Sequence, residues 1–161
     1  MTHASLTKLV KTLGLLLKCQ QLKLVTAESC TGGYFAQTIT SIPGSSNWFD
    51  RGFVCYSNVA KQDMLHVSPK ILEKFGSVSA PTARAMARGA LKQCDASVSI
   101  AITGIAGPAG GTFKKPVGTV WIAIATKPTK IIAKKYHFTR TRETIRRKTV
   151  FHALKLLISV L

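Results

Sequence analysis

A short apolar run that ends in small polar residues is the feature that most restricts how this chain can fold. Residues 22–33 read LKLVTAESCTGG, in which an apolar, partly β-branched run stops at an acid, a serine, a cysteine and two glycines. A run of this kind, bounded by turn-forming residues, is typical of a buried strand. The glycine pair leads into GGYFAQTIT, which we interpret as a helix. A strand that feeds directly into a helix favours an α/β fold.

Strands and helices are mixed along the rest of the chain in the same way. We expect helices over residues 5–21, 32–40, 59–66, 69–76, 81–94 and 142–161, and strands over residues 22–27, 52–57, 97–103, 117–126 and 130–138. The last two strands are expected to form a hairpin through KPTK. Three of the strands end in polar or glycine-rich loops, an arrangement that predicts a three-layer α/β domain with ligands bound outside the strand ends. No linker or repeat divides the chain, so we predict a single domain over residues 1–161.

The composition argues for a cytoplasmic protein without a membrane span. The longest apolar stretch, VGTVWIAIA, is shorter than the roughly 20 residues that a helix needs to cross a bilayer. The first residues lack the apolar core of a signal peptide, and we interpret them as an amphipathic helix. The four cysteines are far apart, with no C-x-x-C, and the histidines show no H-x-x-x-H. We therefore expect neither a disulfide framework nor a metal site.

The charge is strongly positive. Twenty-three Lys and Arg face six Asp and Glu, which gives a net charge of +17, and nine of the basic residues lie between Lys127 and Lys148. Such a field attracts nucleic acid, anionic lipid or a phosphorylated small molecule. A generally basic proteome would explain the charge equally well, so charge alone does not assign a partner.

Three loops are expected to meet at one edge of the sheet if the first three strands are adjacent and parallel. They are ESCTGG, YSNVAK and TGIAGPAGG, and they supply Ser29, Tyr56, Lys61 and many backbone N–H groups. A serine needs a base within hydrogen-bond distance, and a lysine can be that base if burial or a helix N-terminus lowers its pKa. Tyr56 is a candidate to relay the proton or to orient the lysine. This set of residues is compatible with covalent hydrolysis by a serine that is activated without histidine.

Each of these residues also has an ordinary structural interpretation. Ser29 or Thr31 can simply cap the next helix, and Lys61 can be a solvated helix lysine. Cys30 is a second candidate nucleophile, but no histidine lies in these loops to activate it. The segment GIAGPAGGTFKK matches neither the P-loop nor the dinucleotide-binding pattern. From the residues alone, the choice between helix cap and nucleophile stays open.

Longer motifs resemble the CinA C-terminal domain family in its stand-alone form, many members of which are nicotinamide-nucleotide amidases. The similar segments are TAESCTGG, GSSNWFDRGFVCYSNVAK, ARAMARGAL, TGIAGPAGGTFKKPVGTVWIA and ETIRRKTVFHALKLL, in this order over nearly the whole chain. The resemblance implies a three-layer α/β/α fold with a mixed, mostly parallel sheet of about five strands. It also implies hydrolysis of nicotinamide mononucleotide to nicotinic acid mononucleotide and ammonia in pyridine-nucleotide salvage.

The same resemblance assigns roles to individual residues. Ser29 looks like the nucleophile, Lys61 like its base, and Tyr56 lies beside them. The residues expected to bind substrate come from the two glycine-rich loops and the start of the last helix, where the arginine is similar to one that can reach the substrate phosphate: Cys30, Thr31, Gly32, Gly33, Thr103, Gly104, Ile105, Ala106, Gly107 and Arg142. The family implies no metal and no organic cofactor.

Three departures from the family pattern remove acidic residues. Val59 replaces the Glu of YSNEAK, Ser79–Pro81 replaces SEE, and Arg140–Arg142 replaces Gly-Asp-Arg. Their loss favours phosphate binding and leaves the substrate preference open. The alternatives are a nucleic-acid-binding or competence-associated protein that uses its charge, and a silent member that binds a pyridine nucleotide without turnover. Against the first, the strand-end loops lack the interleaved aromatics that stack bases. Self-association is left open.

Overall fold

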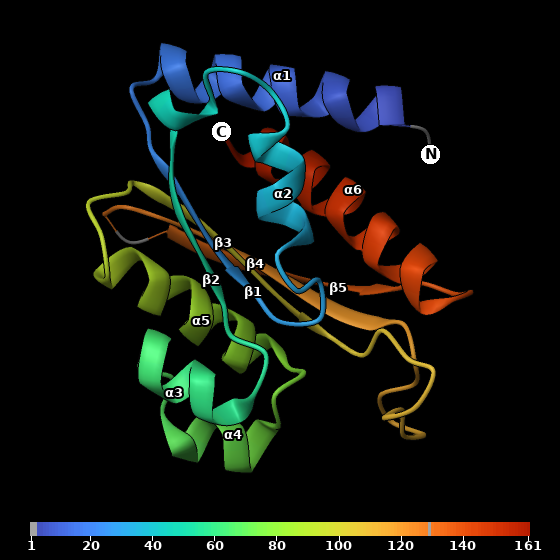
Figure 1. Cartoon of the computed structure of the whole chain (residues 1–161). Coiled ribbons are helices and arrows are strands. Elements are labelled where there is room, and N and C mark those ends of the chain that lie inside the picture. The colour runs from blue at the N-terminus through green and yellow to red at the C-terminus, as the bar shows by residue number, and fades with distance from the viewer. Residues whose placement is uncertain (1–2, 129) are drawn as a thin grey trace.

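The computed structural model describes residues 3–128 and 130–161, which fold around one five-stranded sheet (Figure 1). The strands are β1 (Leu24–Glu28), β2 (Phe49–Val54), β3 (Val98–Gly104), β4 (Thr119–Thr126) and β5 (Lys130–His137), in the order β2-β1-β3-β4-β5. β1 pairs in parallel with β2 and β3, whereas β4 is antiparallel to β3 and β5. Only β4 runs against the others, which confirms the expected mixed sheet.

Six α-helices of the described residues cover the two faces of this sheet. One layer contains α1 (His3–Cys19), α2 (Tyr34–Thr40) and α6 (Arg142–Val160), and the other contains α3 (Asn58–Leu65), α4 (Pro69–Phe75) and α5 (Ala80–Lys92) (Figure 1). A short 3-10 helix, η1 (Ser45–Asn47), precedes β2. The arrangement confirms the three-layer α/β/α architecture.

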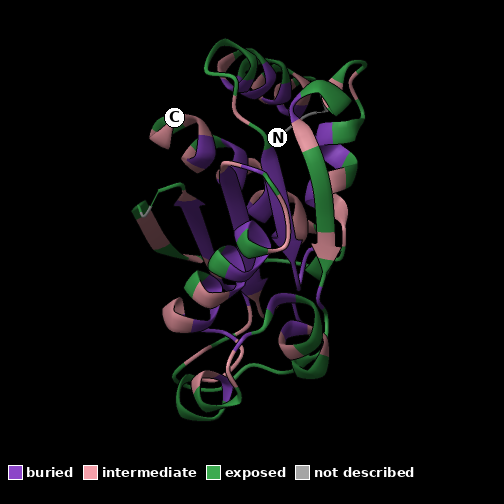
Figure 2. Ribbon diagram, turned by 90° about the vertical axis from the view of Figure 1, so that its left-hand side faces the viewer, coloured by how far each residue is buried: buried purple, intermediate pink, exposed green. Residues whose placement is uncertain are grey.

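The sheet separates two apolar cores. The core under α1, α2 and α6 includes Leu13, Trp48 and Leu154, and the core under α5 includes Leu65 and Met86. Every residue of β1 is buried, as expected for a central strand covered on both faces. β2 at the sheet edge is mainly exposed, and Figure 2 shows this contrast between edge and centre.

Several element boundaries differ from the sequence-based expectation by one to three residues, and two of these differences have a clear physical reason. β2 begins at Phe49 and ends at Val54, earlier than the predicted strand over residues 52–57, because an edge strand with exposed Asp50 and Arg51 lacks the apolar run by which strands are recognised. Helix α2 begins at Tyr34 rather than at residue 32, because Gly32 and Gly33 both have positive φ. The β4–β5 hairpin is confirmed by its pairing, and its turn includes residue 129, which lies outside the described residues.

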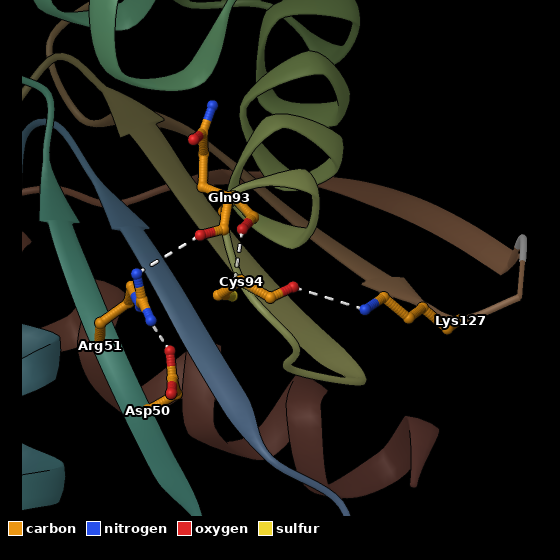
Figure 3. Close-up of polar contacts among 6 residues, drawn as sticks. Asp50, Arg51, Gln93, Cys94 and Lys127 are labelled. Carbon is orange, nitrogen blue, oxygen red and sulfur yellow. Dashed lines mark hydrogen bonds and ion pairs between the residues drawn. The ribbon is translucent and has the colours of Figure 1, made fainter.

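Basic side chains satisfy backbone carbonyls where α5 ends, at the edge of the sheet opposite the three loops. Arg51 Nη1 donates to the Gln93 carbonyl at 3.4 Å, and Lys127 Nζ lies 3.5 Å from the Cys94 carbonyl (Figure 3). The last carbonyls of a helix have no partner within the helix and carry partial negative charge, so cations are favourable there. Part of the positive charge is therefore used structurally.

Within the described ranges, no helix has the length and apolar character needed to cross a membrane.

The contact of α5 with α3 depends on Gly89. An added Cβ at this position would lie 2.0 Å from the carbonyl oxygen of Leu65, closer than any real contact. In an open helix, Gly→Ala stabilises by up to about 1 kcal/mol. Here we expect Gly89→Ala to lower the free energy of unfolding by about 2–3 kcal/mol, the cost of overpacking. Urea unfolding of the two proteins measures this difference, and an unchanged or higher midpoint for the variant would refute the close approach of the helices.

Candidate active site

The loops after β1, β2 and β3 meet at one edge of the sheet, because these three strands are adjacent and parallel. They surround a pocket of about 260 Å³, slightly below the roughly 300–1,000 Å³ common for small-molecule sites. The pocket is lined by Ser29, Cys30, Tyr56, Asn58, Lys61, Ser77, Val78, Thr103, Gly104, Ile105, Ala106, Gly107, Ala109, Gly110 and Arg142. The expected convergence of the three loops is thus present.

Ser29 is held at the centre of this edge. It directly follows β1, and its backbone N–H donates to the Ile102 carbonyl of β3 at 2.9 Å. The residue is 7% exposed, and its Oγ lies 3.1 Å from Lys61 Nζ. The hydroxyl and the amine are therefore within hydrogen-bond distance, as a nucleophile and its base must be.

The Lys61 amino group is buried and surrounded by carbonyl oxygens. The residue is 1% exposed, and Nζ lies 3.0, 3.2 and 3.3 Å from the carbonyl oxygens of Cys55, Tyr56 and Ser57. Ser57 caps α3 by accepting from Ala60 N, which places Lys61 in the first turn, as expected. Burial lowers the pKa of Lys61 because it disfavours the charged amine. The carbonyls partly offset this by accepting the N–H bonds of the ammonium when it forms.

Arg142 joins two sides of the pocket mouth. It begins α6 and donates from Nη1 to the Gly107 carbonyl at 2.8 Å and from Nη2 to the Tyr56 hydroxyl at 2.7 Å. The part of Tyr56 that contacts Lys61 is its backbone carbonyl, while its hydroxyl is bound to Arg142. The guanidinium therefore connects the loop after β2 with the glycine-rich loop after β3.

Glu28, and neither Ser29 nor Thr31, caps the helix that follows β1. Its carboxylate accepts from the backbone N–H of Phe35 at 3.0 Å and of Ala36 at 2.8 Å, and the residue is 1% exposed. The Thr31 hydroxyl is buried and has no hydrogen-bond partner among the described residues. A carboxylate is a good cap because it is attracted to the positive end of a helix. The expectation that Ser29 or Thr31 caps this helix is wrong, which leaves the Ser29 hydroxyl available to Lys61.

The turn after Ser29 lies behind the pocket. Of its residues only Cys30 lines the cavity, whereas Thr31, Gly32 and Gly33 do not. The N–H of Gly32 donates to the Ser29 carbonyl at 3.0 Å. The Thr31 carbonyl accepts from Arg146 of α6 at 2.6 Å. Thr31, Gly32 and Gly33 therefore contribute to the turn that follows Ser29 and not to the pocket lining.

Asn58, Ala109 and Gly110 also line the pocket and belong to the expected loops, whereas Ser77 and Val78, between α4 and α5, were not expected there. Thr103, at the end of β3, donates from its hydroxyl to the Ser77 carbonyl at 2.8 Å and so fixes this part of the pocket. No pattern in the sequence marks Ser77 and Val78 as pocket residues. Their position depends on how α4, α5 and β3 pack together, which the sequence pattern does not show.

Cys30 is poorly suited to act as a thiolate nucleophile. Burial raises the pKa of its thiol to about 12, so the reactive anion is scarce at neutral pH. Cys55, behind Lys61, is also buried, and desolvation raises its pKa to about 11.

Across residues 3–128 and 130–161, no three His, Cys, Asp or Glu side chains gather as a metal site would require.

A serine hydroxyl against a buried lysine amine, at the carboxyl end of parallel strands, defines an α/β domain with a serine–lysine site. The model of the CinA C-terminal domain matches residues 6–161, and the chain belongs to this family. The sequence resemblance is thereby confirmed.

Relatives and solved structures agree with this assignment. The chain is 46% identical over 157 residues to the nicotinamide-nucleotide amidohydrolase PncC of Escherichia coli K12, covering 98% of this chain and 95% of that protein. It is 49% identical over 153 residues to a CinA-like protein of Syntrophobacter fumaroxidans, covering 95% of this chain and 36% of that protein. The crystal structure of competence/damage inducible protein CihA from Agrobacterium tumefaciens superposes with a TM-score of 0.94 at 42% identity, covering 96% of this chain and 94% of that one.

The cap can be tested with a matched pair of variants. Glu28→Gln removes the charge and presents an amide NH₂ to a backbone donor, so we expect the free energy of unfolding to fall by about 1–3 kcal/mol. Thr31→Val keeps the shape and removes only a buried hydroxyl without a protein partner, so we expect the free energy of unfolding to stay the same or to rise. Urea unfolding measures both. A large loss for Thr31→Val with none for Glu28→Gln would restore Thr31 as the cap.

Proposed function

We propose that this protein is a nicotinamide-nucleotide amidase that hydrolyses nicotinamide mononucleotide to nicotinic acid mononucleotide and ammonia. The observation that carries the proposal is the 3.1 Å contact between Lys61 Nζ and Ser29 Oγ at the pocket. The 46% identity to an enzyme named as nicotinamide-nucleotide amidohydrolase, over nearly the full length of both chains, supports the substrate. The reaction would serve pyridine-nucleotide salvage.

In the proposed mechanism, Lys61 begins as the neutral amine. Two N–H bonds point to the surrounding carbonyl oxygens and the lone pair accepts the Ser29 proton, so the nucleophile forms as it attacks the carboxamide carbon. The carbonyls of Cys55 and Tyr56 then stabilise the ammonium. The same ammonium protonates the departing amine, which leaves as ammonia. Water hydrolyses the acyl-enzyme with Lys61 again as base, which releases the pyridine carboxylate and restores Ser29. Every proton transfer uses groups of the chain, so the mechanism requires no cofactor.

The charge of the pocket suits a phosphorylated substrate. Its lining contains no Asp or Glu, and Arg142 is its permanent cation, while Lys61 carries a charge only after it has taken up a proton. Lys61 lies deep beside the nucleophile, while Arg142 is exposed at the mouth. The carboxamide would therefore enter toward Ser29 while the phosphate stays near Arg142, whose planar guanidinium matches phosphate oxygens. Tyr56, bonded to Arg142, would help to hold the guanidinium in place.

Loss of either member of the pair should abolish turnover. We expect Ser29→Ala to lower kcat by about 10⁴-fold or more, and Lys61→Met, which keeps most of the side-chain volume, to lower it by about 10²–10⁴-fold. Ammonia release from nicotinamide mononucleotide measures both, with circular dichroism to show that the variants are folded. Thr12→Ala on α1, far from the pocket, serves as the control. A wild-type protein that releases no ammonia would sink the proposed activity, and full activity in Ser29→Ala would remove Ser29 as the nucleophile.

The activity should increase with pH. Only neutral Lys61 accepts the Ser29 proton, and burial lowers its pKa from the ordinary lysine value of 10.5. We therefore expect kcat/KM to rise as pH increases and to level off below pH 10.5 as the ammonium loses its proton. Initial rates between pH 5 and pH 10 measure the profile. A rate that falls over this range would contradict a lysine base.

Nucleic-acid binding is the second candidate, and the net charge of +17 favours it. The exposed lysines of β5 lie away from the pocket, but the nearby rings pack on one another. Tyr136 stacks on Phe138 at 5.7 Å, and Lys134 lies over the Tyr136 ring at 5.5 Å. Such rings are less available for base stacking. DNA binding that weakens with salt and persists in Ser29→Ala would support this second function.

A further inference from the structure

A second arginine of α6, Arg146, lies one turn after Arg142 and binds the turn behind the nucleophile. Its Nη2 donates to the Thr31 carbonyl at 2.6 Å, and its Nε lies 3.3 Å from the same oxygen. The guanidinium carbon is 5.9 Å from the centre of the Tyr34 ring, and a Cβ on Gly32 would lie 3.6 Å from Nη2. The charged group is therefore fixed against this turn by a carbonyl, a ring and a glycine.

Arg146 makes no ion pair within the part of the chain that the structure describes, where the two salt bridges join Arg51 to Asp50 and Arg147 to Glu143. It is half-buried and does not line the pocket. Its charge is thus directed at a backbone carbonyl and neither at an acid nor at the cavity. Such a contact restricts the orientation of a peptide group.

The orientation of the Thr31–Gly32 peptide group also determines the orientation of the N–H of Cys30, the residue after Ser29. A peptide unit is planar and trans, so its C=O and N–H point in opposite directions. Fixing the Thr31 carbonyl therefore fixes the N–H of Gly32, which donates to the Ser29 carbonyl at 3.0 Å. Fixing the Ser29 carbonyl in turn fixes the N–H of Cys30. Among the described residues, this N–H donates to no other backbone group.

We propose that Arg146 is a positioning residue that, through Thr31 and Gly32, holds the backbone N–H of Cys30 as the oxyanion donor for attack by Ser29. The proposal rests on the proposed serine chemistry and adds a residue that does not touch the substrate. A donor fixed before reaction stabilises the developing oxyanion without reorganisation. Gly32, at φ +57°, permits the turn that this arrangement needs.

The test follows the reactivity of Ser29 itself. A fluorophosphonate forms a bond from Ser29 Oγ to phosphorus, while fluoride leaves and the hydroxyl proton passes to Lys61, and its phosphoryl oxygen occupies the oxyanion position. The rate of labelling, measured by intact mass, reports on the donor independently of any amide substrate. We expect Arg146→Ala to slow labelling by about 10²-fold, the effect of losing an oxyanion donor. Arg146→Lys, which keeps one donor and the charge, should recover part of the rate.

Arg147→Ala is the matched control, because it removes the same charge from the next position of α6, where the side chain pairs with Glu143. We expect its labelling rate to equal that of the wild type. For ammonia release, Arg146→Ala should lower kcat and leave KM within about twofold, since the interaction is made in the transition state. Thermal unfolding of each variant shows whether it is folded.

Two outcomes would overturn the proposal. One is equal labelling of Arg146→Ala and Arg147→Ala, and the other is a higher KM with unchanged kcat, which would make Arg146 a substrate-binding residue. A wild-type protein that is labelled at Ser29 but releases no ammonia would refute the proposed amidase and leave the positioning role supported. A wild-type protein whose Ser29 is not labelled would overturn the positioning role.

Discussion

The burial of one lysine amine is the constraint on which the arrangement of the site depends. Lys61 is 1% exposed, and its Nζ is surrounded by three backbone carbonyls and the Ser29 hydroxyl. A buried charge without partners is costly, so the segment between β2 and α3 has to turn its carbonyls inward around this amine. The same turn brings the lysine to the end of β1, where the serine lies. The environment that accommodates a protonated lysine therefore also holds the amine within hydrogen-bond distance of Ser29.

Glu28 complements this arrangement from the other side of the serine. Its carboxylate occupies two N–H groups at the start of α2, and its backbone carbonyl accepts from Cys55 N at 2.7 Å. One residue thus ties β1 to α2 and to the end of β2. The N-terminus of α2 is consequently occupied by a carboxylate of the protein itself.

Much of the fold could be predicted from the sequence, because strands and helices leave periodic patterns and the three strand-end loops contain recognisable small and polar residues. Ser29 and Lys61 could be found because both stand at such ends, 32 residues apart, and parallel pairing brings the ends together. The roles of Glu28 and Arg146 could not be found in this way. Both act on backbone groups of a turn, and such contacts depend on how the helices lie on the sheet. In the sequence, Arg146 is one of three arginines near the start of the last helix, and nothing in the pattern distinguishes it.

The direction of the strands determines which parts of the sheet lie at the pocket and which lie away from it. All three loops of the site follow β1, β2 and β3, while β4 runs the other way and β5 forms the far edge. None of the four lysines of β5 and its hairpin, Lys127, Lys130, Lys134 and Lys135, lines the pocket. Substitutions there would therefore change the net charge of the molecule without changing the walls around Ser29 and Lys61.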